Sequence, residues 1–263
     1  MQISEEQFQA VSALVKETGA YILEQRRSFQ QESVEQKALH DLVSYVDKTS
    51  EEKILQGLLP ILPGAAMIAE ESGVLQTNSP FCWILDPLDG TTNFIHHIPH
   101  FCISLALQYQ GNLVAAWVYE IVSDSLFTAE LGKGAQCNGN SIHVSQQTQL
   151  EKSLIATGFP VNNYDFIDAH MQSVKEVVLK TRGVRRLGTA AFDLCMVACG
   201  KVEAYFEYAL KPWDVAAGTL IVREAGGKVT DYAGNEENVL FGEQILASNT
   251  HVHEQMFEIV FRR

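Results

Sequence analysis

The chain has 263 residues, of which 46% are hydrophobic and 19% are charged, and its formal net charge at pH 7 is -13. This charge repels polyanions, so binding to nucleic acid or to an anionic membrane is not expected, and the balanced composition argues against disorder. The acidic, amphipathic N-terminus and the lack of a long apolar run predict a cytoplasmic protein. The five cysteines contain no C-x-x-C pair, and we expect them to be reduced.

The first half of the chain starts with helical periodicity and then becomes rich in strands. Ser4 to Gln7 have the pattern of a capping box, and apolar residues at helical spacing predict a helix that ends near Ser28. A second helix is expected over 48–59, ended by Pro60. Strands of a mixed or antiparallel sheet are then predicted at 65–69, 81–85, 102–109, 113–119 and 126–130.

The second half of the chain alternates between strands and helices. Strands are predicted at 154–157, near Val184, at 202–208 and at 228–230, and helices are predicted at 167–180, 190–198 and 215–225. This alternation is typical of layered α/β proteins. We therefore expect one domain over residues 1–263, made of two closely packed lobes of about 1–145 and 146–263.

Acidic residues stand at the ends of several apolar runs: Asp47, Glu70, Asp86, Asp89 and Asp214. Ligands of open α/β sheets bind at the ends of strands, so these carboxylates are expected to meet. Two like charges about 4 Å apart repel by roughly 4 kcal/mol at an effective dielectric near 20. A cluster of them must protonate, separate or bind cations, and we expect cations. Oxygen ligands without His or Cys favour Mg²⁺, which keeps positions for water and phosphate oxygens.

The segment WILDPLDGTTNF, from Trp83 to Phe94, places two of these aspartates directly before a Gly-Thr-Thr turn. Gly90 allows the backbone to approach a ligand closely, and a helix that begins at Thr91 would offer free N–H groups to an anion. The segment therefore predicts half of a two-metal phosphatase site, with the other half supplied by Glu70 and Asp214.

These motifs resemble those of a known family. DPLDGTTNF at 86–94 and WDVAAG at 213–218 are similar to the two signature motifs of the inositol monophosphatase family, and DLVSYVD at 41–47, AEES at 69–72 and GTAA at 188–191 agree with it. The order and spacing fit from about Gln36 to Asp231. The resemblance implies an α/β fold, a layered αβαβα sandwich of the sugar-phosphatase type with mixed or antiparallel sheets, and a homodimer. It also implies a Mg²⁺-dependent phosphatase with two or three Mg²⁺ ions per active site.

The resemblance further implies roles for individual residues. The metal ligands would be Glu70, Asp86, the carbonyl of Leu88, Asp89 and Asp214. Glu70 and Thr91, with Asp47 behind Thr91, would position and activate a metal-bound water that attacks the phosphate directly. The amides of Gly90 and Thr91 would hold the phosphate. The polyol of the substrate would lie in a pocket lined by Asp89, Ala190, Glu207 and Asp214.

Glu207 favours an inositol-like substrate, because a carboxylate can accept hydrogen bonds from adjacent ring hydroxyls. The expected reaction is therefore hydrolysis of inositol 1-phosphate to inositol and phosphate. The metal motifs do not choose among related esters, so a sugar phosphate, histidinol phosphate and 3'-phosphoadenosine 5'-phosphate stay open, as does a regulatory binding protein that retains the fold. Asp47 and Asp214 could also simply cap helices, and Asp193 is expected to make a structural hydrogen bond.

The same resemblance predicts that Li⁺ inhibits the enzyme. Phosphate release from inositol 1-phosphate at a fixed Mg²⁺ concentration should fall as Li⁺ replaces K⁺ at constant ionic strength. Activity that is unaffected by high Li⁺ would count against close membership of the family.

Overall fold

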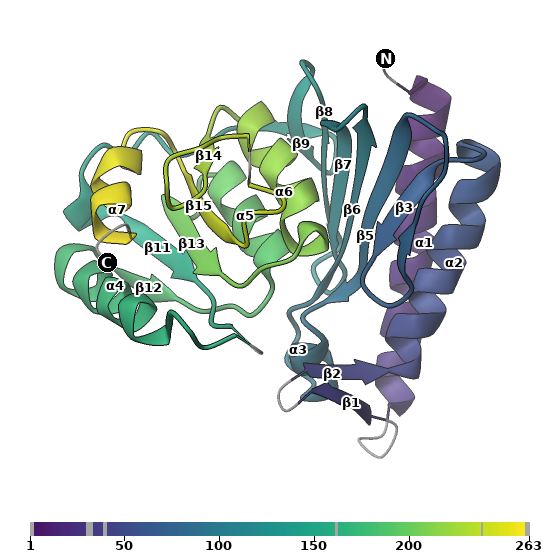
Figure 1. The fold of residues 1–263 in the computed structure, drawn as a ribbon, viewed down its shortest axis with the longest axis horizontal. Helices are drawn as coiled ribbons and strands as arrows, with labels where there is room; N and C mark the ends of the chain where they lie inside the picture. Colours follow the sequence, from purple (N-terminus) through teal and green to yellow (C-terminus); the bar gives the residue numbers. More distant parts are fainter. Residues whose placement is uncertain (1–2, 30–33, 39–40, 161–162, 238, 261–263) are drawn as a thin grey trace.

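The computed structural model describes residues 3–29, 34–38, 41–160, 163–237 and 239–260, and these form five layers. A pair of helices, a large sheet, a second pair of helices, a smaller sheet and a third pair of helices follow one another across the molecule (Figure 1). This order confirms the predicted αβαβα sandwich. None of the helices in the described ranges is both long enough and apolar enough to cross a membrane.

The first layer contains α1 (Glu5–Ser28) and α2 (Tyr45–Ile61), and the hairpin β1 (Val34–Ala38) and β2 (Asp41–Ser44) connects them. The capping box predicted at Ser4 is present. Helix α2 begins earlier than predicted, because the Ser44 hydroxyl accepts a hydrogen bond from the Val46 amide. Pro60 is accommodated inside the last turn, and the helix ends at Ile61, two residues after the predicted last residue at position 59.

The large sheet is mixed, as predicted. Its strand order is β10-β9-β8-β7-β6-β5-β3-β4, and only β3 and β5 run parallel. Alternate residues of β5 point to opposite faces, so Trp83 and Leu85 pack with α1 and α2 while Ile84 packs with α5 and α6. The strands are β3 (Ala66–Ala69), β4 (Gly73–Leu75), β5 (Phe81–Asp89), β6 (Cys102–Tyr109), β7 (Asn112–Glu120), β8 (Ser125–Glu130), β9 (Gly134–Cys137) and β10 (Asn140–Ile142).

The smaller sheet has the strand order β12-β11-β13-β15-β14, with β11 parallel to both of its neighbours and the other pairs antiparallel. Its strands are β11 (Leu154–Thr157), β12 (Gly183–Arg185), β13 (Ala204–Tyr208), β14 (Lys228–Thr230) and β15 (Gln244–Ser248). Helices α5 (Ala190–Ala198) and α6 (Pro212–Glu224) lie between the two sheets (Figure 1). Helices α4 (Ile167–Lys180) and α7 (His253–Val260) cover the outer face.

One core cluster joins the two sheets. It contains Ala106 and Ala116 of the large sheet, Tyr205 of the smaller sheet, and the apolar faces of α5 and α6. Because domains are defined by a core of their own, we propose that the parts near 1–145 and 146–263 fold as one domain.

The packing of α5 on α6 predicts the effect of one substitution. A Cβ on Gly218 of α6 would lie 2.5 Å from Leu194 Cβ on α5, and that atom moves only with its backbone. Gly218→Ala should therefore lower the free energy of unfolding by roughly 1–3 kcal/mol, although alanine favours helix. Chemical denaturation measures this change. Gly57→Ala is the matched control in α2, because the atoms it would meet belong to the flexible Leu14 side chain; equal stability of the two variants would contradict a rigid contact.

Candidate active site

A cavity of about 180 Å³ opens between the two sheets. Its walls come from the carboxyl ends of β5 and β13 and the residues after them, from the residues that follow β3, β11 and β12, and from the first turns of α3 (Thr91–Ile95), α5 and α6. Carboxyl ends of strands and amino ends of helices thus meet at one point, which is where α/β proteins bind ligands.

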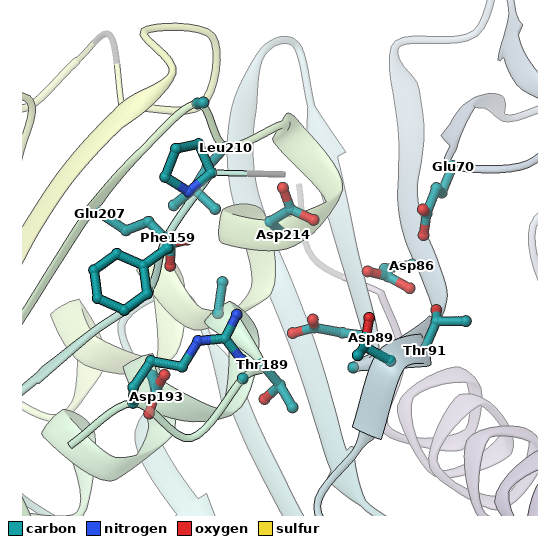
Figure 2. Close-up of a pocket in the computed structure, with 18 of the residues that line it drawn as sticks. Glu70, Asp86, Asp89, Thr91, Phe159, Thr189, Asp193, Glu207, Leu210 and Asp214 are labelled. Atoms are coloured by element: carbon teal, nitrogen blue, oxygen red, sulfur yellow. The ribbon is translucent and has the colours of Figure 1, made fainter. Parts of the chain in front are cut away.

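Each predicted site residue except Asp47 lines this cavity: Glu70, Asp86, Leu88, Asp89, Gly90, Thr91, Ala190, Glu207 and Asp214. Figure 2 shows Glu70, Asp86 and Thr91 on one side of the cavity and Glu207 on the other, with Asp214 between them. Asp47 lies behind Thr91 and reaches the cavity only through it. The structure therefore brings the predicted residues together, while their roles stay predictions.

An irregularity in β5 presents the acidic residues to the cavity. The pairing of β5 with β6 shifts register between Asp86 and Asp89, at the position of Pro87. Such a bulge turns side chains away from the regular alternation, so both aspartates and the Leu88 carbonyl can serve one site. The Leu88 amide donates a hydrogen bond of 2.9 Å to Asp86 Oδ1, which fixes that carboxylate.

Gly90 makes the turn after β5 possible. Its φ of 95° lies in the left-handed region, which favours glycine. A Cβ at this position would lie 2.8 Å from Thr189 Cγ2 and 3.2 Å from the His100 carbonyl oxygen. A side chain is therefore excluded by both conformation and space, and α3 can begin directly at Thr91.

The carboxylates raise each other's pKa values. Burial is the largest cause for Asp86, and repulsion from Glu70 follows, so its pKa lies well above the usual range. Burial also raises the pKa of Asp89, with repulsion from Asp214 as the next cause, although the Ala191 amide donates a hydrogen bond of 2.9 Å to its Oδ2. Because burial and neighbouring charges disfavour the ionised form of each carboxyl group, a bound cation would stabilise the ionised site.

Thr91, which is half-buried, forms a hydrogen-bonded pair with the buried Asp47. The Thr91 hydroxyl lies 2.9 Å from Asp47 Oδ1 and 3.0 Å from the Leu88 carbonyl oxygen. Asp47 Oδ2 accepts hydrogen bonds from the Ser44 amide at 2.9 Å and the Ser44 hydroxyl at 2.6 Å. Burial raises the pKa of Asp47, while the hydrogen bonds from Ser44 and Thr91 oppose this rise. Asp47 thus caps α2 and contacts Thr91 at the same time.

Two further acidic residues support the cavity, and sequence reasoning gave neither a functional role. Glu51 of α2 accepts hydrogen bonds from the amides of Glu71 and Ser72, at 2.9 and 2.8 Å, and so holds the turn that carries Glu70. Its position four residues after Asp47 on one helix face was the available signal. Asp193 lines the cavity, and within the described residues its buried Oδ1 has no hydrogen-bond partner.

The residues present fit a hard divalent cation. The donors that face the cavity are carboxylates and one backbone carbonyl, and Mg²⁺ prefers oxygen ligands of this kind. In the described part of the chain, no three Asp, Glu, His or Cys side chains close around a single point tightly enough to enclose a metal alone. Mg²⁺ usually takes one or two carboxylates and completes its shell with water and phosphate oxygens.

Comparison with known proteins agrees with this geometry. A sequence model of the inositol monophosphatase family matches residues 4–261. The chain is 42% identical over 255 residues to the chloroplastic phosphatase IMPL1 of Arabidopsis thaliana, covering 94% of this chain and 68% of that protein. It is 41% identical over 222 residues to the Nus factor SuhB of Escherichia coli K12, covering 84% and 83%. The solved inositol monophosphatase of Anabaena (Nostoc) sp. PCC 7120 has a TM-score of 0.85 at 34% identity, covering 96% and 94%.

The raised pKa values of Asp86 and Asp89 predict how pH affects metal binding. A raised pKa means that the carboxyl group keeps its proton at pH values where an ordinary aspartate is ionised, so Mg²⁺ must displace protons. Mg²⁺ affinity should therefore rise with pH. Calorimetric titrations at one pH in buffers of different ionisation enthalpy should give different heats, and Asp86→Asn should release fewer protons. Heats that are independent of the buffer would contradict the shifts.

Proposed function

Because the chain belongs to the inositol monophosphatase family, we propose that it is a Mg²⁺-dependent phosphatase that hydrolyses inositol 1-phosphate to inositol and phosphate. The observation that carries this proposal is the cavity itself. It combines a cluster of carboxylates suited to Mg²⁺ with a separate carboxylate, Glu207, on the opposite wall (Figure 2). The first group suits a phosphate with its metal, and the second suits hydroxyl groups.

The metal would be held by oxygen atoms of Glu70, Asp86, Leu88, Asp89 and Asp214. When bound, Mg²⁺ supplies charge neutralisation of the phosphate, activation of the attacking water and stabilisation of the leaving oxygen. The four carboxylates among these ligands supply the negative charge that would retain the cation, and the hydrogen bonds to Asp86 and Asp89 limit how far those two side chains can move. We propose two or three ions per site.

Thr91 positions the attacking water in this proposal. Its hydroxyl has one proton, and Asp47 Oδ1 is a well-placed acceptor for it at 2.9 Å. A hydroxyl that donates to Asp47 keeps lone pairs with which it can accept a hydrogen bond from water. Glu70, on the same side of the cavity, provides the base that receives the proton (Figure 2). The water oxygen then bonds directly to the phosphorus as the bond from phosphorus to the alcohol oxygen breaks. The alcohol oxygen takes up a proton, and no phospho-enzyme forms.

The turn at Gly90 and Thr91 holds the phosphate. The first amides of a helix have no partner inside that helix, so they are available to an anion. The absence of a side chain at Gly90 lets phosphate oxygens come close to the backbone. In this proposal the phosphate lies between the carboxylate cluster and α3.

The opposite wall selects the alcohol. Glu207 is 7% exposed, and burial raises its pKa to about 7, although the Tyr205 hydroxyl opposes the rise. A carboxyl group near its pKa at neutral pH can both accept and donate hydrogen bonds to a polyol. Asp89, Ala190 and Asp214 complete this part of the pocket in our proposal.

A nucleotide is the main alternative substrate. Solved structures of one relative, SaIMPase-II, are named as bound to inositol monophosphate and as bound to 2'AMP, at 26% and 27% identity to this chain. That protein therefore accepts both kinds of ligand. The cavity of about 180 Å³ is smaller than typical pockets for drug-sized ligands, of roughly 300–1,000 Å³, which favours the smaller ester here.

A regulatory role is a second candidate function, and a specific observation favours it. A relative with 41% identity is named a Nus factor, not a phosphatase. A formal charge of -13 disfavours direct binding to nucleic acid, so such a role would act through protein contacts. A partner that is retained equally by wild type and Asp89→Asn would support this second role.

We also propose that the protein is a cytoplasmic homodimer. Light scattering measures this stoichiometry.

The proposed function predicts a substrate order. Phosphate release should require Mg²⁺ and be fastest for inositol 1-phosphate in a panel with glycerol 2-phosphate, fructose 1,6-bisphosphate, histidinol phosphate, 2'AMP and 3'-phosphoadenosine 5'-phosphate. Another preferred ester would overturn the polyol assignment but leave the phosphatase chemistry, and no turnover at all would move the regulatory role to the front.

The carboxylate cluster predicts the effect of removing one charge. Asp86→Asn should lower kcat by about 100-fold or more, because the cation and the phosphate both depend on this charge. Asp124→Asn is the matched control, since the Asp124 side chain is 71% exposed and pairs only with Lys16 and Tyr119 in the contacts described. Substantial turnover by a folded Asp86→Asn protein, verified by circular dichroism, would refute the assignment.

A further inference from the structure

The Glu207 carboxylate is held by neighbours on two sides. It belongs to β13, whose five residues are all buried, and it faces the cavity across from Glu70 and Asp86 (Figure 2). Long acidic side chains have several rotamers, so a carboxylate that selects among hydroxyl groups needs neighbours that restrict it.

Tyr205 supplies the first restriction. It precedes Glu207 by two residues on the same strand, so both side chains lie on one face of the sheet. Its ring is fully buried in the core shared by the two sheets, and its hydroxyl donates a short hydrogen bond to Glu207 Oε2. Among the described residues, no donor hydrogen-bonds to Glu207 Oε1, so one carboxylate oxygen is engaged by Tyr205 and the other is left for a ligand.

Gly158 supplies the second restriction. A Cβ at this position would overlap all three atoms of the Glu207 carboxylate, so the carboxylate lies directly against the glycine backbone. That backbone is itself fixed, because His170 Nε2 lies 2.9 Å from the Gly158 carbonyl oxygen. The preceding Thr157 hydroxyl also donates a hydrogen bond of 2.7 Å to the Phe206 carbonyl on β13. The two strands therefore hold the space in which Glu207 sits.

Resting on the proposed function, we propose that Tyr205 is a specificity-determining positioning residue that acts through Glu207, and that Gly158 is its steric counterpart. Tyr205 holds Oε2, Gly158 lets the carboxylate lie flat against the backbone, and Oε1 is thereby aimed at a hydroxyl of the alcohol group. Both residues contact Glu207, which lies across the cavity from Thr91 (Figure 2). Their loss should change which esters are accepted while the hydrolytic step is retained.

The test compares two esters that share a phosphate but differ in hydroxyl groups. For Tyr205→Phe, the KM for inositol 1-phosphate should rise about tenfold, in line with the loss of a hydrogen bond to a charged group. The KM for phenyl phosphate and both kcat values should stay within about twofold. Tyr232→Phe is the matched control, because its hydroxyl is also buried but has no hydrogen-bond partner in the described ranges; it should leave both esters unchanged.

A double-mutant cycle separates positioning from a general structural effect. In a Glu207→Ala background, Tyr205→Phe should cause no further rise in KM, because its route of action is gone. Gly158→Ala keeps the tyrosine hydroxyl and should also raise the KM for inositol 1-phosphate but not the KM for phenyl phosphate. If Tyr205→Phe does not fold, this variant tests the inference in its place.

Three results would overturn the inference. The first is an equal rise in KM for both esters in Tyr205→Phe. The second is that the effects of Tyr205→Phe and Glu207→Ala on KM add up in the double variant. The third is that Gly158→Ala changes KM for both esters equally. If wild type hydrolyses phenyl phosphate but not inositol 1-phosphate, the polyol proposal fails and this inference fails with it. If wild type handles inositol 1-phosphate well and the Tyr205→Phe and Gly158→Ala variants show no selectivity change, only this inference fails.

Discussion

Mutual repulsion among buried carboxylates is the constraint on which the rest of the structure depends. Asp86 is almost fully buried, and Glu70, Asp89 and Asp214 are close enough to raise its pKa. A chain gains nothing in stability from such an arrangement, because burial and like charges both disfavour the ionised forms. The rigid framework around them keeps these groups together, and in the proposed function a bound cation would offset their repulsion.

The framework is made by packing two sheets on a shared pair of helices. Small residues of α5 and α6 allow this close approach, and polar contacts fix the alignment at the cavity. Asp89 accepts a hydrogen bond from the first turn of α5, and Ser104 of β6 donates one of 2.9 Å to the Trp213 carbonyl at the start of α6. The position of Asp214 relative to the β5 carboxylates therefore follows from core packing between distant parts of the sequence.

The sequence predicted those features that local pattern encodes. The bounds of α4, α5, β6, β11 and β14 agree with prediction, and the carboxylate motifs do meet at strand ends. Strand β15 and helix α7 were not predicted. Strand β15 is defined by its pairing with β13, where Ala204 lies opposite Ser248, and these two residues are far apart in the sequence. Helix α6 starts before the predicted residue, since Asp214 accepts a hydrogen bond from the Lys211 amide. The supporting role of Glu51 was not predicted, because Glu51 accepts hydrogen bonds from a turn that is distant from it in the sequence.

The bulge in β5 and the carboxylate of Glu207 lie on different sheets, and this has an evolutionary consequence. Most of the candidate metal ligands belong to the larger sheet, while β11 and β13 of the smaller sheet contribute to the wall that would meet the alcohol in the proposed function. Mutations in the second group can alter the accepted molecule without disturbing the first. After gene duplication, one copy could thus acquire a new substrate in a few steps, while the inherited reaction is preserved.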